Sequence, residues 1–363
     1  MNKDELLKAI ETRNTYAIFA NAFRQHSLDV IGQGWPGTKL KLEWLLNNSL
    51  LAADTLDELK GIYVENILYA QKAVTLWAID RDVARQLFDR LEEFVDPDSP
   101  YRALYPLPLP DQELRGLRLG IPTYVHDLGN RKTLVLGSRR TTSKEETLPP
   151  ESISDALRDQ GFVELVGRRN FVSPVFDSIT VTPASGLVEM RIDLAKGVSE
   201  REIISLREGL RTKFNQRARE VLGVDVLLDQ LPLNLWPALR PLYQGDDWSV
   251  QRLGHVNEGG YINANRGRHR TQDVRDDNYH RAGEGAVANL QLWSVTAVFS
   301  SPGGYATPTL SLEGDSRLVS VQQPHLDLAR VWDCACAEDY YQVLDTLLAC
   351  LPAQTETQSE SNA

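Results

Sequence analysis

Residues 178–222 read SITVTPASGLVEMRIDLAKGVSEREIISLREGLRTKFNQRAREVL. Polar and apolar residues alternate over 178–181 and 187–193, and the Pro-Ala-Ser-Gly run between them is typical of a turn, so this part predicts a β-hairpin. Ser199 and Glu202 then form a capping box ahead of apolar residues at helical spacing, which predicts a helix to about Leu222.

Short alternating segments continue on both sides of this hairpin and predict further strands. Consecutive predicted strands often have no crossover helix between them, which favours mixed or antiparallel sheets and an α+β fold with packed helices. A short helix is expected around 234–243 and a final one over about 338–350. The further candidate strands are 119–125, 133–137, 162–166, 171–176, 250–256, 290–299, 309–312 and 318–321.

The first 96 residues show helical rather than alternating periodicity. Helices are predicted over 3–28, over 39–51, from Asp54 past Trp77, and on to about Val95. Five prolines then follow within a few residues, which predicts a stiff, extended connector. The predicted organisation is a helical N-terminal domain (1–96), a proline-rich connector (97–111), an α+β region (112–351) with a sub-boundary near 225–232, and a disordered tail (352–363).

Composition limits the compartment and the partners. Lys and Arg number 39 against 50 Asp and Glu, a net charge of -11, so any contact with a polyanion must be local. Three cysteines are a poor basis for a disulfide framework and favour a reducing cytoplasm. No stretch is long and apolar enough for a membrane span, and no signal peptide is recognisable, so we expect no membrane contact.

Several common catalytic motifs are missing from the sequence. It contains no glycine-rich loop ending in Lys-Ser or Lys-Thr, no Gly-x-Gly-x-x-Gly after a strand and no Gly-x-Ser-x-Gly. Cys334 and Cys336 lack the second ligand pair that a structural zinc site needs. No cofactor is therefore predicted, apart from a divalent metal discussed below.

The basic segment over 252–281 is the main candidate site. Its arginines give residues 266–281 a local charge of +2, because five arginines there outnumber three aspartates. Guanidinium groups can grip phosphates while a tyrosine stacks on a base, as backbone-directed or single-stranded nucleic-acid binding requires. The candidate binding residues are Arg252, Arg266, Arg268, Arg270, Arg275, Arg281, Tyr261 and Tyr279.

Three other interpretations of this segment stay open. His255, His269 or His280 with Asp276 or Asp277 could hold a divalent metal that activates water, since imidazole and carboxylate are suitable ligands. The arginines and aspartates could instead pair across a domain or subunit interface. The last alternative is a solvated loop whose mixed charges neutralise one another.

A second candidate lies on the hairpin. Asp177 on one strand, with Glu189 and Arg191 on the next, resembles the acid and Glu-x-Lys arrangement of restriction-endonuclease-like folds, in which two carboxylates hold a metal and a cation faces the phosphate. Arginine stands here in place of the lysine. Alternating polar residues on the outer face of a hairpin give the same pattern, so solvated strand residues are the competing interpretation.

These observations predict a cytoplasmic binding or assembly component rather than an enzyme of a recognisable class. Its basic loop is expected to contact nucleic acid or an acidic protein surface, with a protein partner or self-association as a further expectation. The alternative is a metal-dependent phosphodiesterase or nuclease that uses the same loop or the hairpin pair. A binder should be strongly salt-dependent and insensitive to chelators, whereas a metal enzyme should depend on the ion.

Overall fold

The computed structural model describes residues 2–48, 52–117, 119–195, 197–223, 228, 231–270, 272–286 and 290–352. Within these residues the fold is α+β, as predicted, and is built around a ten-stranded sheet with the order β2-β3-β4-β5-β1-β10-β9-β8-β6-β7. Every strand pair is antiparallel. The two outermost strands, β2 and β7, therefore lie at opposite edges of the sheet.

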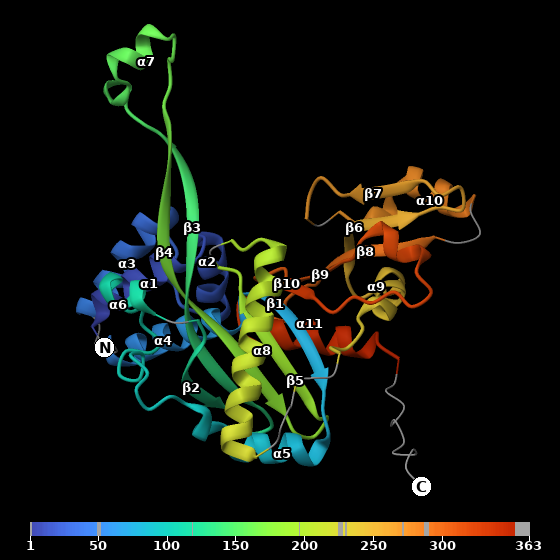
Figure 1. Ribbon diagram of the computed structural model, residues 1–363, viewed down its shortest axis with the longest axis horizontal. Helices are drawn as coiled ribbons and strands as arrows, with labels where there is room; N and C mark the ends of the chain where they lie inside the picture. The colour runs from blue at the N-terminus through green and yellow to red at the C-terminus, as the bar shows by residue number, and fades with distance from the viewer. Residues whose placement is uncertain are drawn as a thin grey trace.

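The elements follow the chain in an order that brings distant segments together (Figure 1). The strands are β1 (Gln71–Ala78), β2 (Ile121–Asp127), β3 (Lys132–Thr147), β4 (Val166–Thr182), β5 (Leu187–Asp193), β6 (Ser249–Val256), β7 (Ile262–Arg266), β8 (Gln291–Val298), β9 (Thr309–Glu313) and β10 (Ala329–Trp332). The α-helices are α1 (Lys3–Arg13), α2 (Tyr16–Gln25), α3 (Gly34–Asn48), α4 (Ala52–Tyr69), α5 (Arg81–Asp89), α6 (Asp111–Gly116), α7 (Asp155–Asp159), α8 (Glu200–Leu222), α9 (Leu239–Gln244), α10 (Asn278–Gly285) and α11 (Ala337–Ala349). Short 3-10 helices are η1 (Leu91–Phe94), η2 (Pro150–Ser152), η3 (Trp236–Ala238), η4 (Val274–Asp276) and η5 (Ser316–Ser320). None of the helices in the described part of the chain has the length and apolar character needed to cross a membrane.

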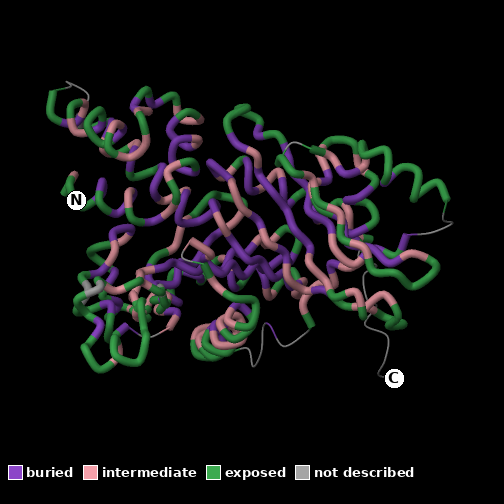
Figure 2. The backbone as a smooth tube through the Cα atoms, turned by 90° about the horizontal axis from the view of Figure 1, so that it is seen from above, coloured by how far each residue is buried: buried purple, intermediate pink, exposed green. Residues whose placement is uncertain are grey.

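Helices cover both faces of the central strands. One apolar core gathers side chains from α5, η1 and α8, and a larger one gathers them from α1 to α4, α9 and α11. Figure 2 shows the buried residues concentrated along the middle of the molecule and the exposed ones around it. Every residue of β5 is buried as a result, although polar and apolar residues alternate along it.

The hairpin and the helix after it form as predicted. Gly186 in the turn has a φ of 68°, and a Cβ there would lie 2.3 Å from the carbonyl oxygen of Ile79, so both the backbone angle and the space require glycine. The Ser199 hydroxyl accepts the amide hydrogen of Glu202, and α8 ends at Gly223, which is also left-handed.

Some predicted elements are wrong. The helix expected from Asp54 past Trp77 ends at Tyr69, and the residues after it form β1, which pairs with β5 and β10. Ala73 to Trp77 is an apolar run buried on both faces, and such a run does not distinguish a central strand from a buried helix. Residues 162–165 are not in a strand, 316–320 form a 3-10 helix, and β7 and β10 were not predicted.

The proline-rich connector is also not extended. Residues 98–106 form turns, and Tyr101 packs edge-on against Phe176 of β4 with ring centroids 5.1 Å apart. Aromatic and leucine residues alternate with the prolines and are buried in the larger core, which folds the segment back. The pairing of β1 with β5 and β10 crosses the domain boundary placed at 97–111, which stays a prediction. Most of the sub-boundary near 225–232 and nearly all of the 352–363 tail lie outside the described residues.

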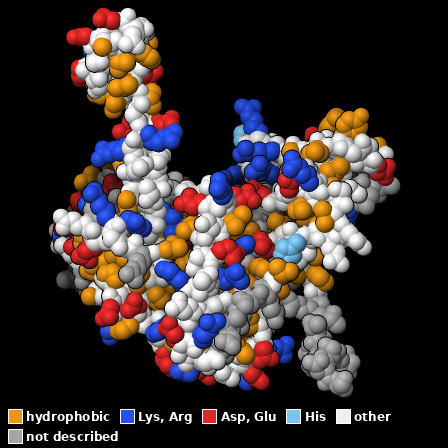
Figure 3. Space-filling model, in the orientation of Figure 1, with side chains coloured by type: hydrophobic (Ala, Val, Ile, Leu, Met, Phe, Trp, Pro, Cys, Tyr) orange, Lys and Arg blue, Asp and Glu red, His pale blue; other side chains and the backbone are white. Residues whose placement is uncertain are grey.

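Two parts of the molecule project from the sheet. Beyond their buried ends, β3 and β4 continue as a two-stranded arm that stays paired to Thr147 and Val166 and carries α7 at its tip (Figure 1). The β6–β7 hairpin, with α10 beside it, forms the other projection at the far edge of the sheet. The space-filling view shows an open space between the two (Figure 3).

Candidate nucleic-acid interface

The basic segment is not one loop. Arg252 lies on β6 and Arg266 on the edge strand β7, and the rest of the segment passes through η4 into α10. Figure 3 shows Lys and Arg side chains gathered on the side of this projection that faces the arm. The candidate residues therefore fall into two groups, one on the β6–β7 hairpin with the loop that follows it, and one in the segment from η4 to α10.

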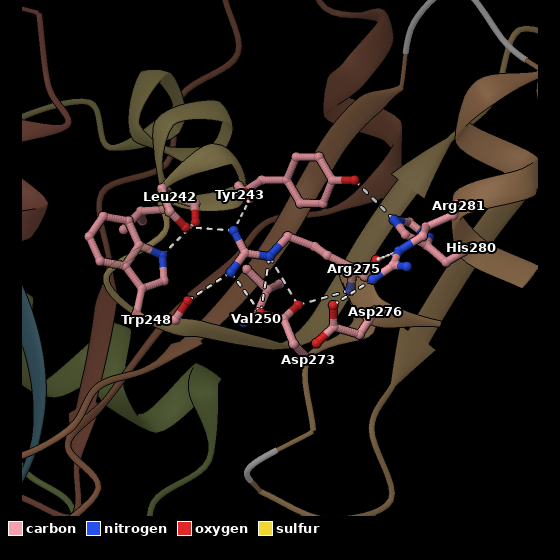
Figure 4. Close-up of polar contacts among 10 residues, drawn as sticks. Leu242, Tyr243, Trp248, Val250, Asp273, Arg275, Asp276, His280 and Arg281 are labelled. Atoms are coloured by element: carbon pink, nitrogen blue, oxygen red, sulfur yellow. Dashed lines mark hydrogen bonds and ion pairs between the residues drawn. The ribbon is translucent and has the colours of Figure 1, made fainter. Parts of the chain in front are cut away.

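Arg275 belongs to the second group and has a structural role (Figure 4). Its guanidinium donates to the carbonyl oxygens of Tyr243 at 3.0 Å, Gly245 at 2.5 Å and Trp248 at 2.7 Å. It also forms an ion pair with Asp273 at 2.6 Å, and that carboxylate accepts the amide hydrogen of Val250. Because these acceptors occupy the guanidinium, Arg275 is not available to a phosphate, which corrects its assignment as a binding residue.

The same contacts lower the pKa of the Asp273 carboxylate. Partial burial raises its pKa, but the hydrogen bonds from Arg275 and from the backbone outweigh burial, and the pKa is lowered overall. The pair therefore stays charged and fixes the segment that follows α9.

Three other arginines have carboxylate partners. Arg281 pairs with Asp276 at 2.7 Å, Arg270 pairs with Asp333, and Arg252 lies 3.7 Å from Glu313. About half of each arginine side chain is exposed. Asp276 is also exposed, and an exposed pair of this kind contributes only about 0 to 1 kcal/mol, so a phosphate can replace that carboxylate at little cost. Asp333 and Glu313 are only 14% and 32% exposed, so Arg270 and Arg252 each offer an accessible guanidinium beside a more shielded carboxylate.

Arg266 and Arg268 differ from the others. Both are exposed, and neither has a carboxylate within ion-pair distance among the residues described. Arg266 is the direct register partner of Arg252 across the β6–β7 pair, which puts two guanidinium groups on one face of the hairpin. We call Arg252, Arg266, Arg268 and Arg270 the arginine surface.

A groove of about 750 Å³ runs beside this surface. Arg252 and Arg266 line it together with Trp293, Glu313 and Asp315. The indole of Trp293 lies so close to Gly254 that a Cβ there would come within 2.6 Å of the ring, and its buried Nε1 has no hydrogen-bond partner in the described part of the chain. Sequence reasoning did not find Trp293, because a single Trp within a strand is more often a packing residue. The acidic side chains restrict an anion to the arginine side of the groove.

The two candidate tyrosines are strongly exposed. Tyr261 is 72% exposed in the turn between β6 and β7, and Tyr279 is 85% exposed on α10. Asn257 Oδ1 accepts the amide hydrogen of Tyr261 at 3.0 Å and orders that turn. Exposed aromatic rings near a basic surface can stack on unpaired bases; Tyr261 lies in the hairpin turn, and Tyr279 lies on the other side of β7 from Arg252 and Arg266.

The residues proposed as metal ligands do not form one site. His269 is exposed in the loop after β7, Asp276 pairs with Arg281, and Asp277 accepts the amide hydrogen of His280 at the start of α10. Only His255 and His280 lie together, with ring centroids 6.0 Å apart. Across the described residues there is no group of three or more His, Cys, Asp or Glu side chains placed to hold a metal ion.

The hairpin candidates are buried, which contradicts both interpretations of them. Asp177 accepts two hydrogen bonds from Arg140, at 2.7 and 2.8 Å, and Glu189 pairs with Arg191 at 2.5 Å. The side chains of Asp177, Glu189 and Arg191 have no measurable exposure. They are neither solvated residues nor groups that a nucleic acid can reach.

The sequence analysis also missed the polar side chains around the histidine pair. Asn263 and Asn265 lie on β7 beside His255, and the only signal for them is the Asn-x-Asn pattern of a short alternating strand. A comparison of the chain with models of known protein families and with curated proteins finds no match, so the site is interpreted from its own geometry.

Proposed function

We propose that the protein is a cytoplasmic binding component that holds the phosphate backbone of a single-stranded nucleic acid on the arginine surface. The observation that carries the proposal is the pair Arg266 and Arg268, which are exposed without a carboxylate partner among the described residues although the chain has a net charge of -11. Unneutralised guanidinium groups on an acidic body attract polyanions locally.

The surroundings of the arginine surface support a single strand rather than a duplex. Tyr261 and Tyr279 offer exposed rings for stacking, which unpaired bases accept and paired bases do not. The arm on the other side of the open space also carries two exposed arginines, Arg169 and Arg168, the second paired with Glu145. A flexible single strand can turn from the arginine surface toward the arm at little cost, whereas bending a short duplex costs free energy.

The test is fluorescence anisotropy with a short labelled single strand of DNA or RNA, at about 50 and about 200 mM KCl. We expect binding that weakens steeply with salt. Replacing Arg266 and Arg268 together by alanine should weaken binding at least about tenfold at the lower salt and reduce the salt slope by about 1.4, since each lost phosphate contact removes about 0.7.

The matched control is the double variant Arg85→Ala, Arg90→Ala, which removes the same charge from α5 and the residue after it and should leave affinity nearly unchanged. Equal loss in both double variants would mean that net charge alone is responsible. Binding to an acidic polypeptide but not to a single strand, with the same dependence on Arg266 and Arg268, would replace the nucleic acid by an acidic protein partner.

A further inference from the structure

A second cavity lies under the edge strand, on the other side of β7 from the groove. It has a volume of about 350 Å³ and lies between the β6–β7 hairpin and α10. His255, Asn263, Asn265, His280 and Glu284 line it. Asn265 also lines the groove beside Arg266, so this residue of the edge strand borders both hollows.

His255 is a buried wall residue of the cavity with a hydrogen-bonding position that the described residues leave free. His255 is 8% exposed, and its Nδ1 is buried without a hydrogen-bond partner among the described residues. Leaving a buried nitrogen unpaired is unfavourable, so the ring keeps unused hydrogen-bonding capacity beside the cavity. Burial lowers the pKa of His255, and the neighbouring His280 lowers it further, which favours a neutral ring.

His280 is held in one orientation. The Tyr243 hydroxyl donates to Glu284 at 2.8 Å. At its 3.0 Å contact with His280, which Figure 4 shows, it therefore accepts the hydrogen of Nε2. The wall of the cavity therefore combines imidazole nitrogens and a carboxylate with amide groups that both donate and accept.

The charge of the lining excludes a phosphate. None of the described residues that line the cavity is lysine or arginine, and Glu284 contributes a carboxylate. A neutral ligand with donors and acceptors on its edge fits this set, because amide side chains pair with base edges and a carboxylate accepts from amino groups. The exposed ring of Tyr279 and the buried side chain of Leu290 supply apolar contacts.

We propose that this cavity binds one nucleobase of the strand whose phosphates lie on the arginine surface. The inference rests on the proposed function and adds base recognition to it. The volume accommodates a single base or nucleoside and not several nucleotides. A base swung out of a single strand has little stacking to lose, so its insertion costs less than it would from a duplex.

The experiment compares a short labelled strand that carries bases with an abasic strand of the same length and charge, again by fluorescence anisotropy. The intact protein should bind at least one of the four homopolymers about tenfold or more tightly than the abasic strand, as one buried stacked base predicts. His255→Leu should remove the part of this preference that the cavity contributes and leave the abasic affinity unchanged. Asn130→Ala, in the turn after β2 at the opposite edge of the sheet, is the matched control and should keep it.

The outcomes separate this inference from the proposed function. Equal, salt-dependent binding of abasic and base-bearing strands would overturn the base site and leave the backbone interface standing. If neither strand binds, the unfolding temperature is measured with and without free nucleosides. A nucleoside-induced increase that is lost in His255→Leu would keep the cavity as a base site and reject the backbone interface. No increase would reject both. If the variant itself unfolds at a much lower temperature than the intact protein, Asn263→Leu replaces it, because Asn263 lines the same cavity from the edge strand β7.

Discussion

The β4–β5 and β6–β7 hairpins contain similar residues and expose them very differently. Both are antiparallel and both carry arginines, but Arg191 of β5 is fully buried while Arg266 of β7 is exposed. The cause is position in the sheet: β5 lies among central strands with helices on both faces, whereas β7 is an edge strand. The chemistry of a charged residue therefore depends on what covers its strand, and equal substitutions should have unequal effects in the two hairpins.

The largest effect is expected at Asp193 of β5. Its carboxylate binds Arg13 at 2.8 Å and lies 3.6 Å from Lys72, and all three side chains are almost entirely buried. Burial alone would raise its pKa, but the two cations hold the pKa well below the usual range. Asp193→Ala leaves two buried cations without their carboxylate and should lower the free energy of unfolding by about 3 to 5 kcal/mol, measured by urea denaturation.

Its control is Glu145→Ala on the projecting arm, where the lost ion pair with Arg168 is exposed. The expected change there is below about 1 kcal/mol. Similar losses in both variants would show that burial does not distinguish the two kinds of pair.

The next effect is expected within the basic segment itself. Arg275→Ala removes the guanidinium that joins three carbonyl oxygens of residues 243–248 to Asp273. Several charge-assisted bonds are lost in a half-buried position, so we expect the free energy of unfolding to fall by about 2 to 3 kcal/mol. Anisotropy should show no loss of affinity for a single strand in the folded variant; a selective loss would show that Arg275 binds the strand after all.

A smaller effect concerns pH. Burial lowers the pKa of Lys72 to about 8, although Asp193 opposes the shift. The unfolded chain then binds more protons than the folded one between about pH 8 and 10.5, so the contribution of Lys72 to stability rises with pH over that window. From pH 8 to 9.5 the gain is about 1 to 2 kcal/mol relative to Lys72→Met, measured by urea denaturation. A flat difference between the two proteins would place the pKa of Lys72 outside this window.

The contrast between the hairpins also explains what could be predicted from the sequence. The β5 strand and α8 are correct because their signals, a turn and a capping box, are local. β1 was missed because its strand character comes from pairing with β5 and β10, far away in the chain. The alternation in β5 suggested a half-exposed strand, but Arg13, which pairs with Asp193, is 180 residues away.

The same reasoning applies to the candidate site. Clustered arginines identified the right region, and Arg266 and Arg268 stay candidates there. The sequence could not separate them from Arg275, because the acceptors of that guanidinium are backbone carbonyl oxygens about thirty residues earlier. The cavity behind β7 could not be predicted from the sequence either, because it forms only when α10 packs against the hairpin and brings His280 beside His255.

The smallest effect is expected at Arg281, six residues from Arg275 and of the same type. Its pair with Asp276 is more than half exposed on both sides, so Arg281→Ala should change the free energy of unfolding by no more than about 0.5 kcal/mol. Urea denaturation at low and high salt checks this value, because an exposed pair is screened and a buried one is not. If Arg281→Ala cost as much as Arg275→Ala, exposure would not be the property that separates the structural arginines of this segment from those free to bind a partner.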